Sequence, residues 1–107
     1  VKIDHEGRPV EAGARDDPAR YLVNPAGFTI HSAIHMARPD VFCVVHTHTA
    51  AGAAVSAQKQ GLLPISQHAL KYYGHIAYHD YEGIALDLAE RDRLVNDLGS
   101  HNAMILK

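Results

Sequence analysis

The stretch Val41-Phe42-Cys43-Val44-Val45-His46-Thr47-His48-Thr49 decides how this sequence is interpreted. Its first five residues are apolar and mostly β-favouring, which predicts a buried strand, and two histidines follow at positions i and i+2. Residues two apart on a strand point to the same side, so both imidazoles can converge at the strand's end. In α/β folds, this is where a β/α connection opens a functional pocket. Two neutral imidazoles so placed favour a zinc-type site, with two ordinary surface histidines as the alternative.

Composition restricts the class of protein. The chain has 107 residues, 47% of them hydrophobic, and a net charge of -2, which predicts a small globular domain. The absence of a basic stripe argues against nucleic-acid binding. Cys43 is the one cysteine, so no internal disulfide forms and a reducing, cytoplasmic location is expected. No apolar stretch approaches 18 residues and no signal peptide opens the chain, so membrane insertion is not expected.

Strands and helices are expected to alternate along the chain. Apolar spacing predicts a helix over residues 28–38, which Pro39 ends. Thr49 is expected to cap a second helix that runs to about Gln60, and a third begins at Asp87 and Glu90 and ends at Leu98. Strands are expected at residues 1–4, 41–45, 62–66, 75–78 and 103–107. This order indicates an α/β layered fold. The two outermost strands lie flush with the chain ends, which predicts an internal portion of a longer protein.

Several segments, in order, resemble the class II aldolase/adducin family, closest to its adducin head-domain branch and the bacterial relatives of that branch. They are Asn24-Pro25-Ala26-Gly27-Phe28, Ala37-Arg38-Pro39-Asp40-Val41, Val44-Val45-His46-Thr47-His48-Thr49, Gly61-Leu62-Leu63-Pro64-Ile65-Ser66 and Ala77-Tyr78-His79-Asp80-Tyr81-Glu82-Gly83. The resemblance implies a three-layer α/β/α class II aldolase-like fold with a central mixed, largely antiparallel sheet. Residues 1–107 would be a partial domain, lacking its N-terminal portion and the segment that carries a third metal-ligand histidine.

The resemblance also implies a metal site. In the family's enzymes, a His-x-His pair at this place and a third histidine hold zinc or a similar divalent ion. His46 and His48 match that pair, zinc is the leading ion and manganese the next, and the third histidine would fall just beyond Lys107. Such an ion can polarise the carbonyl of a hydroxy-carbonyl substrate during aldol cleavage, epimerisation or decarboxylation. A separate acid/base must then move the proton.

The family's acids are missing at the matching positions. Where the sugar-phosphate aldolases carry Ser-Ser-Glu, this chain has Pro25, Ala26 and Gly27. Where the epimerases carry an aspartate, it has Leu70. These departures disfavour a sugar-phosphate substrate.

Other side chains are weaker candidates for a site. His68, Tyr72 and Tyr73 could supply the acid/base, although packing or interface roles are the alternative. His31 and His35 share a helix face, which favours packing or solvent exposure over a metal pair. A pairing of His79 with the adjacent Asp80 would require a turn, because neighbouring strand residues point to opposite faces, so a structural role is favoured for His79.

Two functions from different classes remain open at this point. The first is a metal-dependent lyase acting on a small hydroxy-carbonyl compound. The second is a non-catalytic, adducin-like module that binds actin. Family members resembling this chain form tetramers. A homotetramer is therefore expected, with the small-residue helix after Thr49 and the Tyr72-Tyr73 pair favouring close association.

Overall fold

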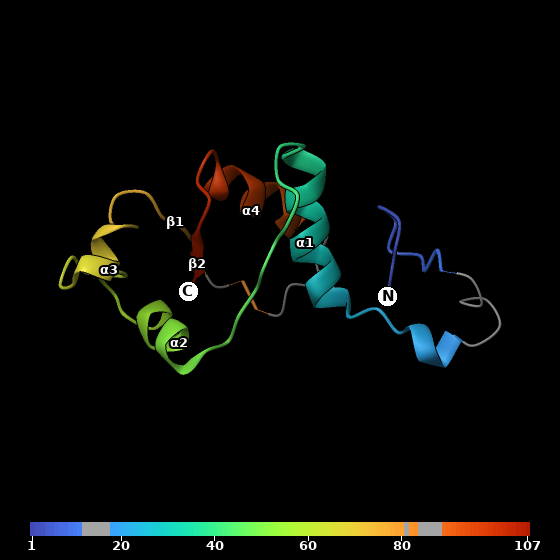
Figure 1. The fold of residues 1–107 in the computed structure, drawn as a ribbon, viewed down its shortest axis with the longest axis horizontal. Helices are drawn as coiled ribbons and strands as arrows, with labels where there is room; N and C mark the ends of the chain where they lie inside the picture. Colours follow the sequence, from blue (N-terminus) through green and yellow to red (C-terminus); the bar gives the residue numbers. More distant parts are fainter. Residues whose placement is uncertain (12–17, 81, 84–88) are drawn as a thin grey trace. The chain divides into compact units, whose positions relative to one another are not determined.

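The computed structural model describes residues 1–11, 18–80, 82–83 and 89–107. They form two compact units, whose helices and strands are shown in Figure 1. The first unit comprises Val1–Val44 with Ile84–Arg91, and the second comprises Val45–Gly83 with Asp92–Lys107. The predicted Asp87 helix start lies outside the described residues.

The first unit is built on the helix α1, Pro25–Ala37. Asn24 caps it, because its side-chain oxygen accepts the N–H groups of Ala26 and Gly27. Pro25 occupies the first turn, where a missing N–H costs nothing, so the helix begins three residues before the predicted start. Its inward face buries an apolar and small-residue stripe comprising Thr29, Ile30, Ser32, Ala33 and Ile34. The predicted end before Pro39 is confirmed.

The N-terminal residues pack beside this helix. The strand predicted at residues 1–4 is reduced to one antiparallel bridge between Ile3 and Pro9. Asp4 closes the turn between them by accepting the N–H groups of Glu6 and Arg8. A short 3-10 helix, η1 (Pro18–Tyr21), precedes α1.

A parallel two-stranded sheet forms the centre of the second unit. Strand β1 (Ala77–His79) pairs with β2 (Met104–Leu106), with Tyr78 opposite Ile105. Both strands were predicted: the expected range 103–107 includes β2, whereas 75–78 overlaps β1 but ends one residue before it. The helix α2 (Ala50–Ser56) lies against β2. A four-residue helix, α3 (Gln67–Leu70), was not predicted.

The helix α4 (Glu90–Leu98) ends as predicted at Leu98, before Gly99. It supplies the most deeply buried side chain among the described residues, Leu94, and Leu98 is buried one turn later. Leu94 and Leu98 lie four residues apart, on one face of the helix.

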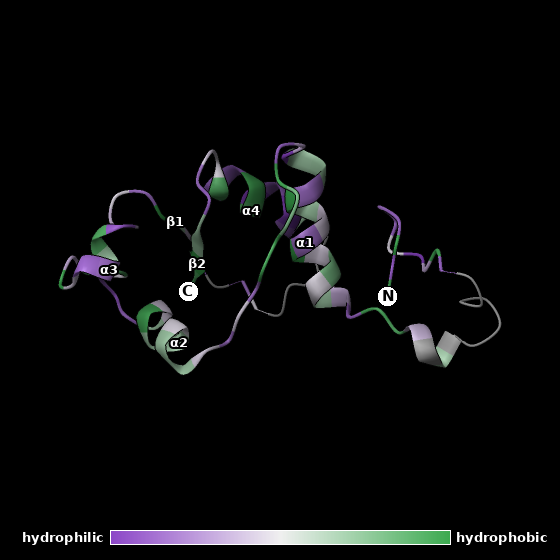
Figure 2. Ribbon diagram, viewed as in Figure 1, coloured by the Kyte–Doolittle hydropathy of each residue, from purple (hydrophilic) through white to green (hydrophobic). Residues whose placement is uncertain are grey.

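The strands predicted at residues 41–45 and 62–66 do not form. Residues 41–45 are extended but belong to no sheet among the described residues, and Phe42 is 93% exposed. Figure 2 colours this segment as hydrophobic. Residues 62–66 form irregular turns instead of a strand. An apolar sequence favours a strand, but a strand forms only when a neighbour satisfies its backbone. The predicted larger, largely antiparallel sheet stays a prediction.

Candidate metal centre

His46 and His48 lie between an extended segment and the start of α2. Thr49 adopts an extended conformation and caps α2, since its hydroxyl accepts the Gly52 N–H at 3.1 Å. The cap was predicted, and it fixes the chain direction one residue after His48. The two histidines therefore lie where extended chain passes into a helix, and not at the end of the predicted strand, which does not form.

The two imidazoles converge. Nε2 of His46 lies 2.8 Å from Nε2 of His48, the ring centroids are 4.6 Å apart and the ring planes make an angle of 79°. A hydrogen bond at this distance requires one ring to donate its Nε2–H and the other ring to accept that proton. Both side chains are exposed. The same two nitrogens could face one metal ion once that proton is released, because imidazole binds metals in its neutral form.

This donor set fits a divalent transition metal, but it supplies two ligands. Among the described residues, no group of three or more histidine, cysteine, aspartate or glutamate side chains is placed to hold an ion. Nitrogen ligands suit zinc, and an open protein site binds it through three ligands. The pair is thus compatible with part of such a centre.

The weaker candidates for a site, His68, Tyr72 and Tyr73, lie on α3 or just after it. His68 is exposed on α3, and Tyr72 and Tyr73 follow in a turn where both are half-exposed. The ring of Tyr72 contacts Nζ of Lys71, which lies 5.6 Å from its centroid.

His31 and His35 share a face of α1, as predicted, and both line a cavity of about 550 Å³ within the first unit. Nδ1 of His35 lies 3.2 Å from the carbonyl oxygen of Val41, which fixes that ring. The rest of the wall is largely apolar and includes Phe28. These features are those of packed, half-buried histidines.

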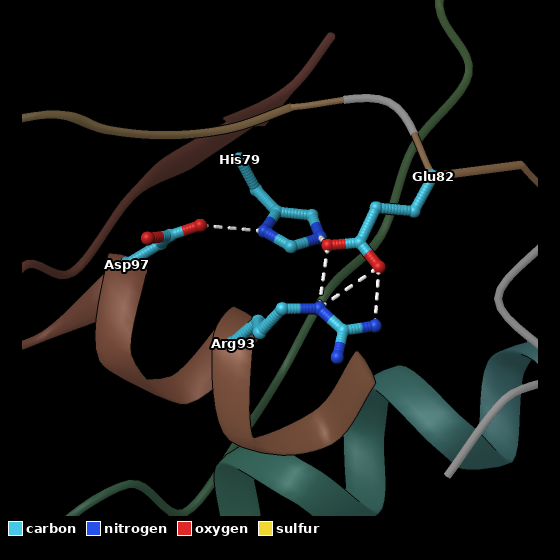
Figure 3. A network of polar contacts seen from close by, with 4 residues as sticks. All are labelled: His79, Glu82, Arg93 and Asp97. Carbon is cyan, nitrogen blue, oxygen red and sulfur yellow. Dashed lines mark hydrogen bonds and ion pairs between the residues drawn. The ribbon is translucent and has the colours of Figure 1, made fainter. Parts of the chain in front are cut away.

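His79 is the centre of a polar cluster that was not predicted from the sequence. The side chain is buried, and its Nδ1 lies 2.7 Å from Asp97 Oδ2 on α4 (Figure 3). Nε2 faces Glu82, whose Oε1 is 3.9 Å away. The structural role expected for His79 agrees with this burial, and the carboxylate that contacts its Nδ1 is that of Asp97. Asp97 lies 18 residues downstream, so the pairing arises from tertiary packing.

Glu82 is in turn held by Arg93 of α4. The Arg93 Nε donates to both carboxylate oxygens of Glu82, at 2.8 and 3.0 Å, and Nη2 completes a forked contact. The Arg93 guanidinium holds the pKa of the Glu82 carboxyl below its usual value, and the nearby His79 acts in the same direction. Arg93 and Asp97 lie four residues apart on α4, a spacing that places them on one face. That spacing is the feature of the sequence from which this cluster could have been predicted.

Comparison with known proteins gives a consistent assignment. Residues 1–107 match the class II aldolase and adducin N-terminal domain. A Caulobacter vibrioides protein, provisionally named a class 2 aldolase protein, is 52% identical over 107 residues, which are 100% of this chain and 39% of that protein. Rat alpha-adducin is 49% identical over 106 residues, covering 99% of this chain and 14% of that protein.

A solved structure agrees with the sequence comparisons. The crystal structure of an aldolase II superfamily protein from Pseudomonas syringae is 58% identical, with a TM-score of 0.88. The match covers 99% of this chain and 41% of that one. The chain thus spans well under half the length of the relatives described here. It belongs to the class II aldolase and adducin family.

Proposed function

We propose that the intact protein is a metal-dependent lyase of the aldolase or decarboxylase type. Its substrate would be a small molecule with a carbonyl beside a hydroxyl. The observation that carries the proposal is the meeting of the two Nε2 atoms of His46 and His48 at 2.8 Å, at an exposed position before α2. Membership of the family supports it.

The proposed site uses His46 and His48 as ligands, with zinc as the first candidate ion and manganese as the second. A third histidine would come from outside these 107 residues, which would make the chain a partial domain. When bound, the ion would polarise the substrate carbonyl and stabilise negative charge developing beside it. The two imidazoles must be neutral to bind the ion, so metal binding should weaken as the pH falls.

The residues at the family's acid positions argue against sugar-phosphate substrates. Gly27 lies in the first turn of α1 and Leu70 ends α3, and neither can transfer a proton. His68, Tyr72 and Tyr73 remain the candidates for an acid/base, because they are accessible and can carry a transferable proton.

The metal assignment is tested on the full-length protein by elemental analysis. The His46→Ala/His48→Ala variant should lose the bound ion and retain its circular dichroism spectrum, because both side chains are exposed. His75→Ala is the matched control: it removes another exposed histidine of the second unit and should keep one equivalent of metal. A double variant that retains a full equivalent would refute the assignment.

The substrate class is tested by a lyase screen. Hydroxy-carbonyl and carboxylated compounds are expected to include a substrate, and fuculose and rhamnulose phosphates are expected to show little cleavage. Turnover of either phosphate at about 1–1,000 per second, the ordinary enzymatic range, would contradict this expectation.

A second candidate function is an adducin-like module that binds actin. The 49% identity to rat alpha-adducin favours it. Sedimentation of the full-length protein with actin filaments separates the two proposals. Filament binding without metal-dependent turnover would support the module, and metal-dependent turnover without filament binding would support the lyase.

A further inference from the structure

The cavity in the first unit is lined by none of the residues of the proposed metal site. Its walls come from the N-terminal residues, from α1 and from the residues just before α1. Its volume of about 550 Å³ falls within the range of about 300–1,000 Å³ that is common for small-molecule sites. Much of the wall is apolar, including Ile3, Leu22 and Phe28. The cavity therefore has a size and a surface suited to the apolar part of a small molecule.

Arg91 places a positive charge next to this cavity. Its Nη2 donates to Ser32 Oγ at 2.7 Å, and its guanidinium carbon lies 4.9 Å from the centroid of the Phe28 ring. Ser32 and Phe28 both line the cavity, and Arg91 belongs to the same unit. Among the described residues no carboxylate pairs with Arg91, and its Nε is buried without a hydrogen-bond partner. A buried charge without a counter-ion is unfavourable, so an anion that enters the cavity would be stabilised.

The cavity wall does not supply that anion. Asp4 is the one acidic residue of the described chain that lines the cavity. Its Oδ1 accepts the backbone N–H groups of Glu6 and Arg8, and its Oδ2 accepts Arg8 Nε at 2.8 Å. The charge of Asp4 is therefore already balanced by Arg8, which leaves the charge of Arg91 without a counterpart.

Two polar side chains of the wall can donate to a ligand. Asn24 uses its side-chain oxygen to cap α1, which leaves its amide nitrogen to donate. The His31 ring lines the cavity and makes no hydrogen bond within the described part of the chain. Amide and imidazole N–H groups are suitable donors to a carboxylate.

We propose that this cavity binds a small carboxylate with an apolar body. The apolar body would contact Phe28 and the apolar residues beside it, and the carboxylate would accept a hydrogen bond from Asn24 or His31. Arg91 acts on the ligand through its charge, because it contacts the wall residues Ser32 and Phe28. The proposal goes beyond the lyase assignment and does not depend on it, since every residue it uses belongs to the first unit.

The test uses the full-length protein and two ligands of similar shape, benzoate and benzyl alcohol. Benzoate is charged at about pH 7 and benzyl alcohol is neutral. Benzoate should bind about tenfold more tightly, because only its charge is complementary to that of Arg91. Ligand-observed NMR titrations measure both dissociation constants.

Substitutions of Arg91 test the source of this preference. Arg91→Gln should reduce the preference for benzoate to about twofold or less, and Arg91→Lys, which keeps the charge, should retain most of it. Lys2→Gln is the matched control and should leave the preference unchanged. It removes an exposed positive charge from the same unit at a position that does not line the cavity.

A second pair of variants makes the test independent of how well Arg91→Gln folds. Leu22 lines the cavity and is 80% exposed, so substitution there should leave the fold intact. Leu22→Glu should weaken the binding of benzoate much more than that of benzyl alcohol, because like charges repel. Leu22→Gln should affect the two ligands alike.

The metal site provides the remaining comparison. The His46→Ala/His48→Ala variant should bind benzoate as the wild type does, because both histidines belong to the second unit. Loss of benzoate binding in that variant would place the ligand at the metal and overturn the proposal. Equal affinities of the wild type for the two ligands, or a preference for benzoate that Leu22→Glu does not change, would also overturn it. Failure of the metal assignment alone would leave these results unchanged.

Discussion

At the scale of single residues, Gly61 is the described glycine at which an added Cβ would meet the closest neighbouring atom. Its φ is +67°, and an added Cβ would lie 2.6 Å from Cε1 and 2.7 Å from Oη of Tyr78. The Leu62 N–H donates to the same Tyr78 hydroxyl at 3.0 Å, so the chain after α2 is held against β1. Gly61→Ala should therefore lower the free energy of unfolding by about 2 kcal/mol or more, from the backbone conformation and the collision together. Denaturant unfolding of the full-length protein measures it.

Gly27 provides the matched control for this prediction. Its φ is not positive, it lies inside α1, and an added Cβ would come no closer than 3.8 Å to Asn24. Alanine favours a helix over glycine, so Gly27→Ala should be neutral or stabilise by up to about 1 kcal/mol. Equal destabilisation by the two substitutions would show that conformation and space at Gly61 are not the cause.

At the scale of elements, the cap of α2 is the feature most open to test. The helix has seven residues and buries none of its side chains, so its end contacts matter more than in a long helix. Thr49→Ala removes the acceptor for the Gly52 N–H and should cost about 1 kcal/mol. Thr49→Ser keeps a hydroxyl and should restore most of the loss. If Ala and Ser behave alike in denaturant unfolding, the hydroxyl does not act as a cap.

Elements set by local signals were predictable from the sequence. The apolar spacing of α1 and the Thr49 cap each involve neighbours along the chain, and both appear where expected. The helix α2 ends earlier than predicted, because the chain tightens into three-residue turns at Gln58 and Gly61. The segment 41–45 failed as a strand because strand formation depends on a partner distant in sequence.

Side-chain contacts also divide into those set by neighbours along the chain, which were predictable, and those set by tertiary packing, which were not. His46 and His48 converge because their spacing places them on one side of an extended chain, a local property. The contact of His79 with Asp97 depends on how α4 packs on β1, which the sequence does not specify locally. Adjacent residues such as His79 and Asp80 suggest a pair by proximity in sequence, yet strand geometry separates them.

At the scale of the whole molecule, the described residues include many large apolar side chains that are exposed. Residues 63–73 contribute a group of exposed large side chains, comprising Leu63, Ile65, Leu70, Tyr72 and Tyr73. Contiguous exposed apolar surface is typical of interaction sites. No described helix is both long enough and apolar enough to cross a membrane. The exposed apolar side chains of residues 63–73 are the reason why we expect a protein–protein interface there.

The assembly prediction follows from that segment. We expect the full-length protein to form a homotetramer with Tyr72 and Tyr73 in a subunit interface, because tyrosines are enriched in interfaces and both rings are half-exposed here. Light scattering should give four times the subunit mass. Tyr72→Lys/Tyr73→Lys should shift that mass toward dimers or monomers, because burying two unpaired ammonium groups is strongly unfavourable. Gln58→Lys adds a charge at another exposed position of the second unit and should leave the mass unchanged. A wild-type monomer at micromolar concentration, or a tetramer indifferent to the tyrosine substitutions, would contradict this placement of the interface.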